Sequence, residues 1–127
     1  MSLVEKQWEF LRQVAELIKE IERRGWVATG GELWRHPNMQ KYYVQIGRSR
    51  TMNSQHLKRL AIDLNLFRPA RPGEEPSVIV NGSPFVLTWN VEDIEPIGRF
   101  WESLSKDNRW GGHFRTFKDV PHFEKEG

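Results

Sequence analysis

The sequence predicts an α+β domain, with helices at the front of the chain and antiparallel strands through its middle and end. Two observations carry this prediction. A long amphipathic helical pattern opens the chain, and short β-rich runs separated by turn residues follow it. The chain has 127 residues, enough for one domain with a modest core. We therefore expect a single domain over 1–127, with an N-terminal helix (1–25) packed on a small antiparallel sheet.

Composition bounds the possible functions. Hydrophobic residues make up 38% and charged residues 28% of the chain, as in ordinary soluble globular proteins, and six Trp suggest a core built on large aromatics. Because the chain has no Cys, disulfides, thiolate chemistry and cysteine-based zinc sites are excluded, and a transition metal would need His, Asp or Glu. A net charge of +2 is too small to favour a nucleic-acid partner. No apolar run has membrane-spanning length, so we expect no membrane insertion.

The first element is a helix predicted over residues 3–24. Ser2 and Glu5 have the spacing of a capping box, and Gly25 is a natural terminator. An apolar stripe recurs at helical spacing and comprises Val4, Trp8, Leu11, Val14, Ile18 and Ile21. We expect this stripe to pack in the core; a membrane-surface role is the alternative. An amphipathic helix at this position is not a signal peptide, so synthesis in the cytoplasm is expected.

The segment before the central strand is predicted to contain two short extended pieces and a second helix. The extended pieces, 26–29 and 33–35, flank the Gly30-Gly31 pair, which favours a turn. Pro37 stands where a helix would start, and apolar residues at helical spacing follow it until Gly47. The polar residues 47–53 are predicted to form a loop.

The second half of the chain is predicted to hold a hairpin and a third helix. A Pro-rich charged stretch, 68–76, indicates a surface loop, and the runs 77–80 and 85–89 flank the turn signal 81–84. Pro96 indicates the start of a third helix that ends near Ser105. Residues 110–115 then predict a turn or strand with close backbone approach at two glycines.

The central stretch, 53–67, poses the main question. Residues 60–67 alternate apolar with polar or small side chains and predict a strand, yet Asp63 lies in its middle. An unpaired carboxylate in such a place is costly, so a cation or hydrogen-bond donors must meet it. His56, seven residues earlier, is one nearby candidate partner.

Four histidines are available as metal ligands: His36, His56, His113 and His122. His36 precedes a helix start, where capping explains it, and His113 follows two glycines and is expected at the surface. His56 and His122 each lie near a carboxylate, Asp63 and Asp119 respectively. Two imidazoles and one carboxylate suit a catalytic zinc ion with an open coordination position, but spacing alone leaves this choice open.

The order and spacing of the residues around these positions also resemble the pattern of a known protein family. Ser54-x-His56-x-x-x-x-Ala61-x-Asp63 resembles the zinc peptidases that include the D-Ala-D-Ala dipeptidases and carboxypeptidases, most closely their phage endolysin branch, the L-alanyl-D-glutamate endopeptidases. Further segments agree in order over residues 32–124: Arg35 before a Pro and a short helix, Trp101-Glu102-Ser103-Leu104, Trp110-Gly111-Gly112-x-Phe114, and Asp119-x-x-His122-Phe123-Glu124. The resemblance implies the hedgehog/D,D-peptidase fold.

The resemblance also assigns roles. It implies one zinc ion held by His56, Asp63 and His122, with Asp119 as general base and later acid. It makes Arg35 the group that stabilises negative charge on the scissile carbonyl oxygen. Ser54, Gln55 and Trp110 are candidates for supporting the ligands or contacting the substrate.

Three positions depart from the family pattern. Arg59 stands where a Gly is common, three residues after the first ligand, so the backbone there is not expected to use a positive φ. Asp119 replaces a Glu found in many relatives, and His36 replaces a small hydroxyl residue. Simpler interpretations stay open: Asp63 could bond backbone N–H groups, Asp119 could cap a turn, and Arg35 could be an ion-pair partner at the core edge.

The resemblance implies a bacteriolytic, zinc-dependent peptidoglycan hydrolase, a monomeric phage endolysin with the catalytic domain alone. The expected substrate is the stem peptide, with the L-Ala-D-Glu amide as first choice. The alternatives are a D,D-carboxypeptidase or D-Ala-D-Ala dipeptidase using the same site, or a catalytically silent wall-binding module. The protein would act in the periplasm or cell wall after release from the host cytoplasm. Whether Arg48, Arg50 or Arg59 contacts the substrate is left open.

Overall fold

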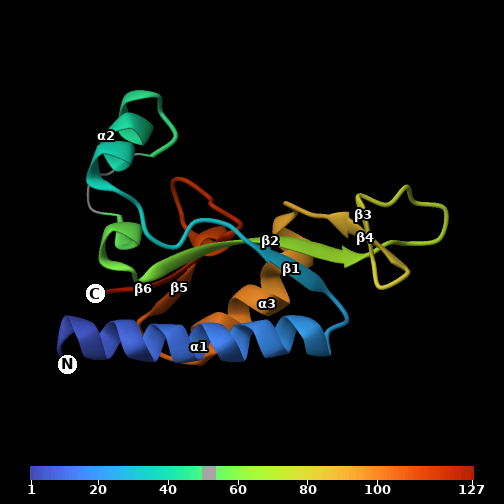
Figure 1. Ribbon diagram of the computed structural model, residues 1–127, viewed down its shortest axis with the longest axis horizontal. Helices are drawn as coiled ribbons and strands as arrows, with labels where there is room; N and C mark the ends of the chain where they lie inside the picture. The colour runs from blue at the N-terminus through green and yellow to red at the C-terminus, as the bar shows by residue number, and fades with distance from the viewer. Residues whose placement is uncertain (50–53) are drawn as a thin grey trace.

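The computed structural model describes residues 1–49 and 54–127, and these form three α-helices and a six-stranded antiparallel sheet (Figure 1). The predicted α+β class is confirmed. In chain order the elements are α1 (Leu3–Arg23), β1 (Val27–Gly30), α2 (Pro37–Gln45), the 3₁₀ helix η1 (Gln55–Lys58), β2 (Ala61–Pro69), β3 (Val78–Val80), β4 (Ser83–Leu87), α3 (Val91–Ser103), β5 (Asn108–Trp110), the 3₁₀ helix η2 (Gly111–His113) and β6 (His122–Lys125).

Strand β2 organises the sheet. The strand order is β3-β4-β2-β6-β5, and β1 also pairs with β2. The start of β2 pairs with β6, so that Asp63 lies opposite His122, while its end pairs with β4. The predicted strand is confirmed and runs on to Pro69. In Figure 1, β2 crosses the middle of the molecule with α1 along one side and α2 standing beyond its starting end.

Helix α1 carries two adjoining apolar stripes, and the predicted core stripe is only partly correct, because Val14 and Ile21 are buried as expected but its other members are not. The capping box of Ser2 and Glu5 is present. However, four members of the predicted core stripe are exposed: Val4 (72%), Trp8 (60%), Leu11 (52%) and Ile18 (42%). The buried stripe comprises Phe10, Val14, Leu17 and Ile21. Because the two stripes adjoin on the helix, apolar spacing alone could not decide which one faces the sheet.

The core fills the space between α1, α3 and one face of β2. Phe10 meets Trp101 edge-on with ring centroids 5.6 Å apart, and Trp101 meets Phe123 in the same way at 6.2 Å. Trp101 and Trp110 are fully buried, whereas three of the other tryptophans are exposed: Trp8, Trp34 and Trp89. The core therefore rests on fewer tryptophans than composition suggested.

Helix α2 and the hairpin follow the predicted order with shifted boundaries. Pro37 occupies the first turn of α2 and His36 caps it, as expected. The hairpin turn is only Asn81-Gly82, with φ of 51° and 82°, so the predicted turn residues 83 and 84 belong to β4. Positive φ at both positions suits the twist of a two-residue hairpin.

Two predicted boundaries are wrong. Residues 33–35 are irregular instead of extended strand. Helix α3 begins at Val91, five residues before Pro96, because Asn90 caps it by accepting a hydrogen bond from the backbone of Asp93. Pro96 lies inside the helix, where it removes one backbone donor. None of the helices in the described part of the chain has the length and apolar character to cross a membrane.

Candidate metal centre

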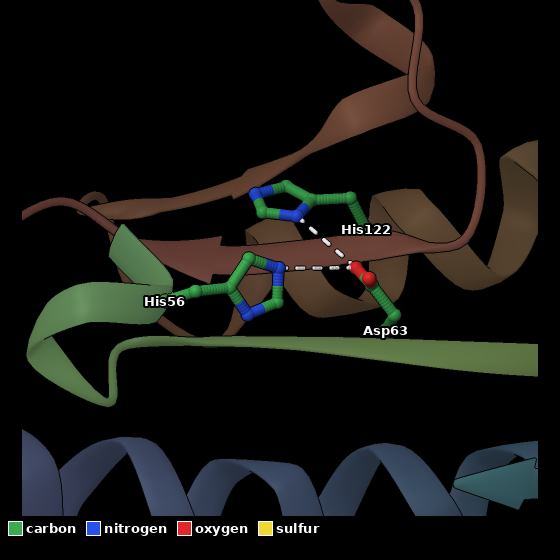
Figure 2. A group of neighbouring side chains, drawn as sticks. All are labelled: His56, Asp63 and His122. Carbon is green, nitrogen blue, oxygen red and sulfur yellow. Dashed lines mark hydrogen bonds and ion pairs between the residues drawn. The ribbon is translucent and has the colours of Figure 1, made fainter. Parts of the chain in front are cut away.

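Three side chains from three separate elements converge at the start of β2 (Figure 2). His56 comes from η1, Asp63 from β2 and His122 from β6. Oδ1 of Asp63 lies 3.3 Å from Nε2 of His56 and 3.3 Å from Nδ1 of His122. One ligand atom from each residue lies within 4.8 Å of the others, which makes the group able to hold a metal ion. These are the three residues that the sequence analysis predicts as metal ligands.

His56 is placed by a tightly closed 3₁₀ turn. Ser54 caps η1, its hydroxyl accepting a hydrogen bond from the backbone N–H of His56 at 3.2 Å. Arg59 ends the turn in the left-handed conformation, with φ of 58° and ψ of 38°. The expectation that Arg59 avoids a positive φ is wrong: the chain keeps the conformation a Gly would favour, at a cost of about 1–2 kcal/mol for a residue with a Cβ. The Arg59 guanidinium packs over the ring of Trp34 at 5.3 Å.

Asp63 is fixed through its backbone on one side and its strand partner on the other. Its N–H donates to the carbonyl of Glu32 and its carbonyl accepts from the N–H of Gly31, both at 2.8 Å. A Cβ at Gly31 would lie 2.9 Å from the Asp63 carbonyl oxygen, so only glycine allows this approach. Since Asp63 and His122 are directly opposed in antiparallel strands, their side chains project from the same face.

The segment that leads into His122 is held by buried groups. The Asp119 N–H donates to the Gly111 carbonyl at 3.0 Å, and the Trp110 indole donates to the Val120 carbonyl at 2.8 Å. A Cβ at Gly111 would lie 2.0 Å from the Asp119 carbonyl oxygen, which explains the predicted close approach at this glycine. Trp110 is fully buried, so it holds the backbone of this segment through its hydrogen bond and is not exposed to a substrate.

In each imidazole, one nitrogen faces the Asp63 carboxylate and the other faces an oxygen atom of a different residue. Nδ1 of His56 lies 3.0 Å from the Leu33 carbonyl oxygen, and Nε2 of His122 lies 2.7 Å from Oε1 of Glu124. Nε2 of His56 is buried and has no hydrogen-bond partner among the described residues. Two imidazole nitrogens and a carboxylate oxygen are donors that zinc prefers, and the outer contacts orient both rings toward one point. The residues therefore fit a bound zinc ion.

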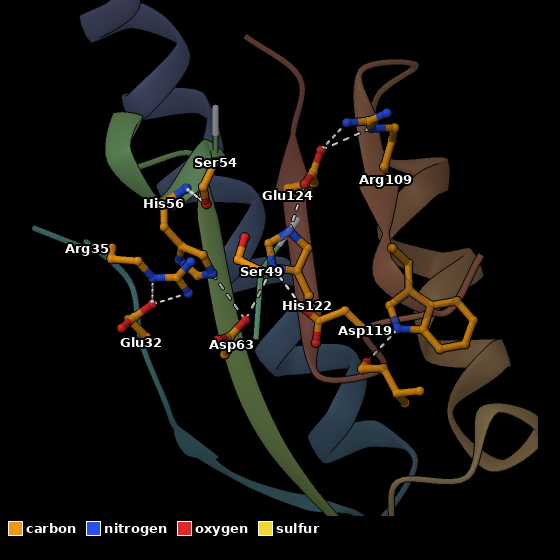
Figure 3. A network of polar contacts seen from close by, with 12 residues as sticks. Glu32, Arg35, Ser49, Ser54, His56, Asp63, Arg109, Asp119, His122 and Glu124 are labelled. Atoms are coloured by element: carbon orange, nitrogen blue, oxygen red, sulfur yellow. Dashed lines mark hydrogen bonds and ion pairs between the residues drawn. The ribbon is translucent and has the colours of Figure 1, made fainter. Parts of the chain in front are cut away.

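Glu124 is a site residue whose role the sequence analysis missed. Its carboxylate lies between His122 and Arg109, whose Nε is 3.0 Å from Glu124 Oε2 (Figure 3). A sequence signal for this contact existed. Residues two apart on a strand share a face, so the pattern His122-x-Glu124 places an acid beside the last ligand once this segment is known to be a strand.

This arrangement shifts the pKa values of several groups in the site. Burial raises the pKa of Asp63, but the imidazoles of His122 and His56 beside the carboxylate outweigh this effect and hold that pKa well below its usual range. Burial lowers the pKa of His122, yet Asp63 and Glu124 raise it to about 9. The pKa of Asp119 is raised, chiefly by burial.

A cleft of about 510 Å³ opens over the group. Asp119 lines it, with Oδ2 3.9 Å from Nδ1 of His122. Arg35 also lines it and is ion-paired with Glu32, while its Nη1 donates to Gln40 at 2.6 Å. Arg35 is therefore both an ion-pair partner of Glu32 and a residue that lines the cleft.

The remaining candidate site residues differ in whether they line the cleft. Ser54, Gln55 and Arg48 line the cleft, whereas Trp110 and Arg59 do not. Arg50, together with Asn53 at the start of the predicted central stretch, lies outside the described residues. His36 caps α2, its Nδ1 accepting from the Asn38 N–H at 3.0 Å. His113 is exposed, and its Nδ1 lies 2.8 Å from Oε1 of Glu102, so neither histidine joins the metal-ligand group.

Fold and geometry together define a class: an α+β domain with a His-Asp-His group at the floor of an open cleft. A protein family described as D-alanyl-D-alanine carboxypeptidase matches residues 47–125, a span that includes all three members of the group. The chain belongs to this family of peptidases.

Among solved structures, the chain is similar to the L-Ala D-Glu endopeptidase ChiX of Serratia marcescens. The TM-score is 0.54 at 24% sequence identity, over 77% of this chain and 65% of that chain. This likeness supports the fold, and the chain spans about 65% of the length of that structure. No match is found among the curated proteins.

Proposed function

We propose that the protein is a zinc-dependent peptidoglycan endopeptidase that cleaves the L-Ala-D-Glu amide of the stem peptide. His56, Asp63 and His122 would hold one zinc ion, with Asp119 as general base and Arg35 as a stabiliser of developing negative charge. The observation that carries the proposal is the convergence of the three donors, all within 4.8 Å, below a cleft that Asp119 also lines. Membership of the peptidase family supports it.

When bound, zinc would supply Lewis acidity, which polarises a peptide carbonyl and makes an attacking water more acidic. Asp119 would accept a proton from that water and return it to the leaving amine. Its place suits both tasks, because it lines the cleft beside His122 without being one of the three donors. Its backbone N–H donates to the Gly111 carbonyl, which fixes the position from which the carboxylate extends into the cleft.

Arg35 would act on the other side of the scissile carbonyl. Its side chain is held by Glu32 and Gln40 and stacks over the Tyr43 ring at 4.7 Å. A guanidinium fixed in this way can stabilise charge on the carbonyl oxygen without first losing side-chain entropy. In Figure 3, Arg35 and Asp119 lie on opposite sides of the Asp63 carboxylate.

The choice of substrate rests on cleft chemistry and on the structural neighbour. Basic side chains line the cleft besides Arg35, namely Arg48, Arg109 and Lys118. A stem peptide that contains D-Glu brings a carboxylate that such groups attract. The neighbour ChiX is described as an L-Ala D-Glu endopeptidase, which favours the same bond here. We further propose a phage endolysin that acts as a monomer on the cell wall, after release from the host cytoplasm.

A D,D-carboxypeptidase or D-Ala-D-Ala dipeptidase activity is the second candidate, favoured by the description of the matching family. A silent wall-binding module is disfavoured, because a structural metal site would need neither Asp119 nor Arg35 at the cleft.

Digestion of purified murein, with mass spectrometry of the released peptides, tests these alternatives. We expect new L-Ala carboxyl ends and new D-Glu amino ends, both abolished by a chelator. Release of D-Ala instead would establish the carboxypeptidase or dipeptidase. Zinc binding without any product would establish the silent module.

A further inference from the structure

The two imidazoles of the metal centre differ in what holds their outer nitrogen. Nδ1 of His56 faces a backbone carbonyl, that of Leu33, which no side-chain substitution removes. Nε2 of His122 faces a side chain, the carboxylate of Glu124, at 2.7 Å. The orientation of one ligand is therefore set by the main chain, and that of the other depends on a single acid.

We propose that Glu124, held in turn by Arg109, is the positioning residue that presents Nδ1 of His122 to the metal. This inference rests on the proposed function, because it assumes that the His-Asp-His group binds zinc. It assigns a task to two residues outside the ligand set and outside the proposed acid-base chemistry.

The register of the strands places Glu124 next to His122. His122 and Glu124 are two residues apart on β6, so they share a face, and Ala61 is the strand partner of Glu124. The small Ala61 side chain leaves room beside Asp63 for the Glu124 carboxylate to turn back onto the imidazole. With Nε2 donating to Glu124, the ring presents Nδ1 to Asp63 and Asp119.

Burial makes the Glu124 carboxylate dependent on its hydrogen-bond donors. Glu124 is only 5% exposed, and a carboxylate so placed is costly unless donors surround it. Its donors are the His122 ring and Arg109, which bonds Oε2 through Nε at 3.0 Å and through Nη2 at 2.5 Å. Arg109 comes from the neighbouring strand β5, where it pairs directly with Glu124. The pair keeps one carboxylate oxygen aimed at His122.

The backbone of Glu124 is fixed independently of its side chain. Its carbonyl accepts a hydrogen bond from the indole of the buried Trp101 at 3.0 Å. Because the strand is anchored in this way, a change at the Glu124 side chain should release the His122 ring without displacing β6.

The test measures zinc affinity by competition with a chromophoric chelator. Glu124→Ala should bind zinc about 10- to 100-fold more weakly than the wild type, the usual cost of losing such an outer partner. Glu124→Gln keeps an acceptor for the imidazole N–H, so it should recover part of this loss. Glu74→Ala is the matched control, because Glu74 is also paired with an arginine but lies at the far end of β2. It should stay within about twofold of the wild type.

A second readout needs no variant. In the zinc-loaded wild type, long-range ¹H–¹⁵N spectra should show the proton of the His122 imidazole on Nε2. A proton on Nδ1, or Glu124→Ala and Glu124→Gln with wild-type zinc affinity, would overturn the assignment. A wild-type protein that binds no zinc would instead overturn the proposed function, and this inference with it.

Discussion

The two ends of β2 each place a charged side chain on a largely covered strand, and they stabilise it in different ways. At the end, Arg68 makes two bonds of 2.7 Å to the carboxylate of Glu74 and lies 3.5 Å from Asp93. At the start, Asp63 lies between the imidazoles of His56 and His122. The first cluster balances its charge with groups that are all ionised at neutral pH. The second depends on a proton or a metal ion to balance its carboxylate.

This difference shows which end of β2 can bind a further cation. A guanidinium paired with carboxylates is complete within the chain, and a further cation gains nothing there. Imidazoles can exchange a proton for a metal, so the start of β2 keeps a binding capacity that its end lacks. Variants at the two ends of β2 can therefore test the difference between the two clusters.

The largest effect is expected at the start of β2. His122→Ala removes a donor from the three-residue group, so stoichiometric zinc binding and murein hydrolysis should both be lost. Zinc content by elemental analysis and product release by mass spectrometry measure these effects. Arg68→Met, which breaks the other cluster, should lower stability but keep the zinc. Zinc retained in full by His122→Ala would remove His122 from the ligand set.

Asp119→Ala separates chemistry from metal binding. The variant should keep one zinc ion and lose about 10²- to 10⁴-fold in kcat, the usual contribution of a general acid-base group. Asp119→Glu should recover part of the activity, since it restores a carboxylate. If Asp119→Ala retains most of the wild-type turnover, another group serves as the base.

Arg35→Met should lower kcat by about 10²- to 10³-fold while zinc affinity stays near that of the wild type. The matched variant Glu32→Gln breaks the ion pair but leaves the guanidinium in place, so it should cost far less activity. Equal losses in the two variants would mean that Arg35 serves only as the partner of Glu32.

The smallest effect concerns pH and the end of β2. The Arg68 hydrogen bond lowers the pKa of Glu74 to about 2, from a usual value of 4.5. A lowered pKa stabilises the folded state above pH 4.5, and this contribution is lost as the pH falls through about 2. Urea unfolding of Glu74→Gln should therefore differ from the wild type at pH 6 and converge with it near pH 2. A difference that does not change with pH would contradict this.

The same contrast explains what the sequence could and could not predict. The convergence of His56, Asp63 and His122 was predicted, because their residue types and order form a recognisable motif. The Arg68–Glu74 pair was not predicted, because it joins a strand to a charged, Pro-rich loop that has no periodicity. Helix α1 was predicted with its ends nearly right, but its buried face only in part, since the stripe that holds Trp8 adjoins the stripe that holds Phe10 and only tertiary packing decides between them.

Local backbone geometry was the least predictable feature of the site. Arg59 adopts a left-handed conformation despite its Cβ, because the turn between η1 and β2 requires it. Glu124 could have been found from strand alternation, but only once β6 was known to begin at His122.

Zinc titration of the metal-stripped protein, assayed on murein, tests the central claim most directly. We expect hydrolysis of the L-Ala-D-Glu amide to rise with added zinc and to reach its plateau at one zinc ion per chain. Full activity in the metal-stripped protein, or no hydrolysis at any zinc concentration, would contradict the account.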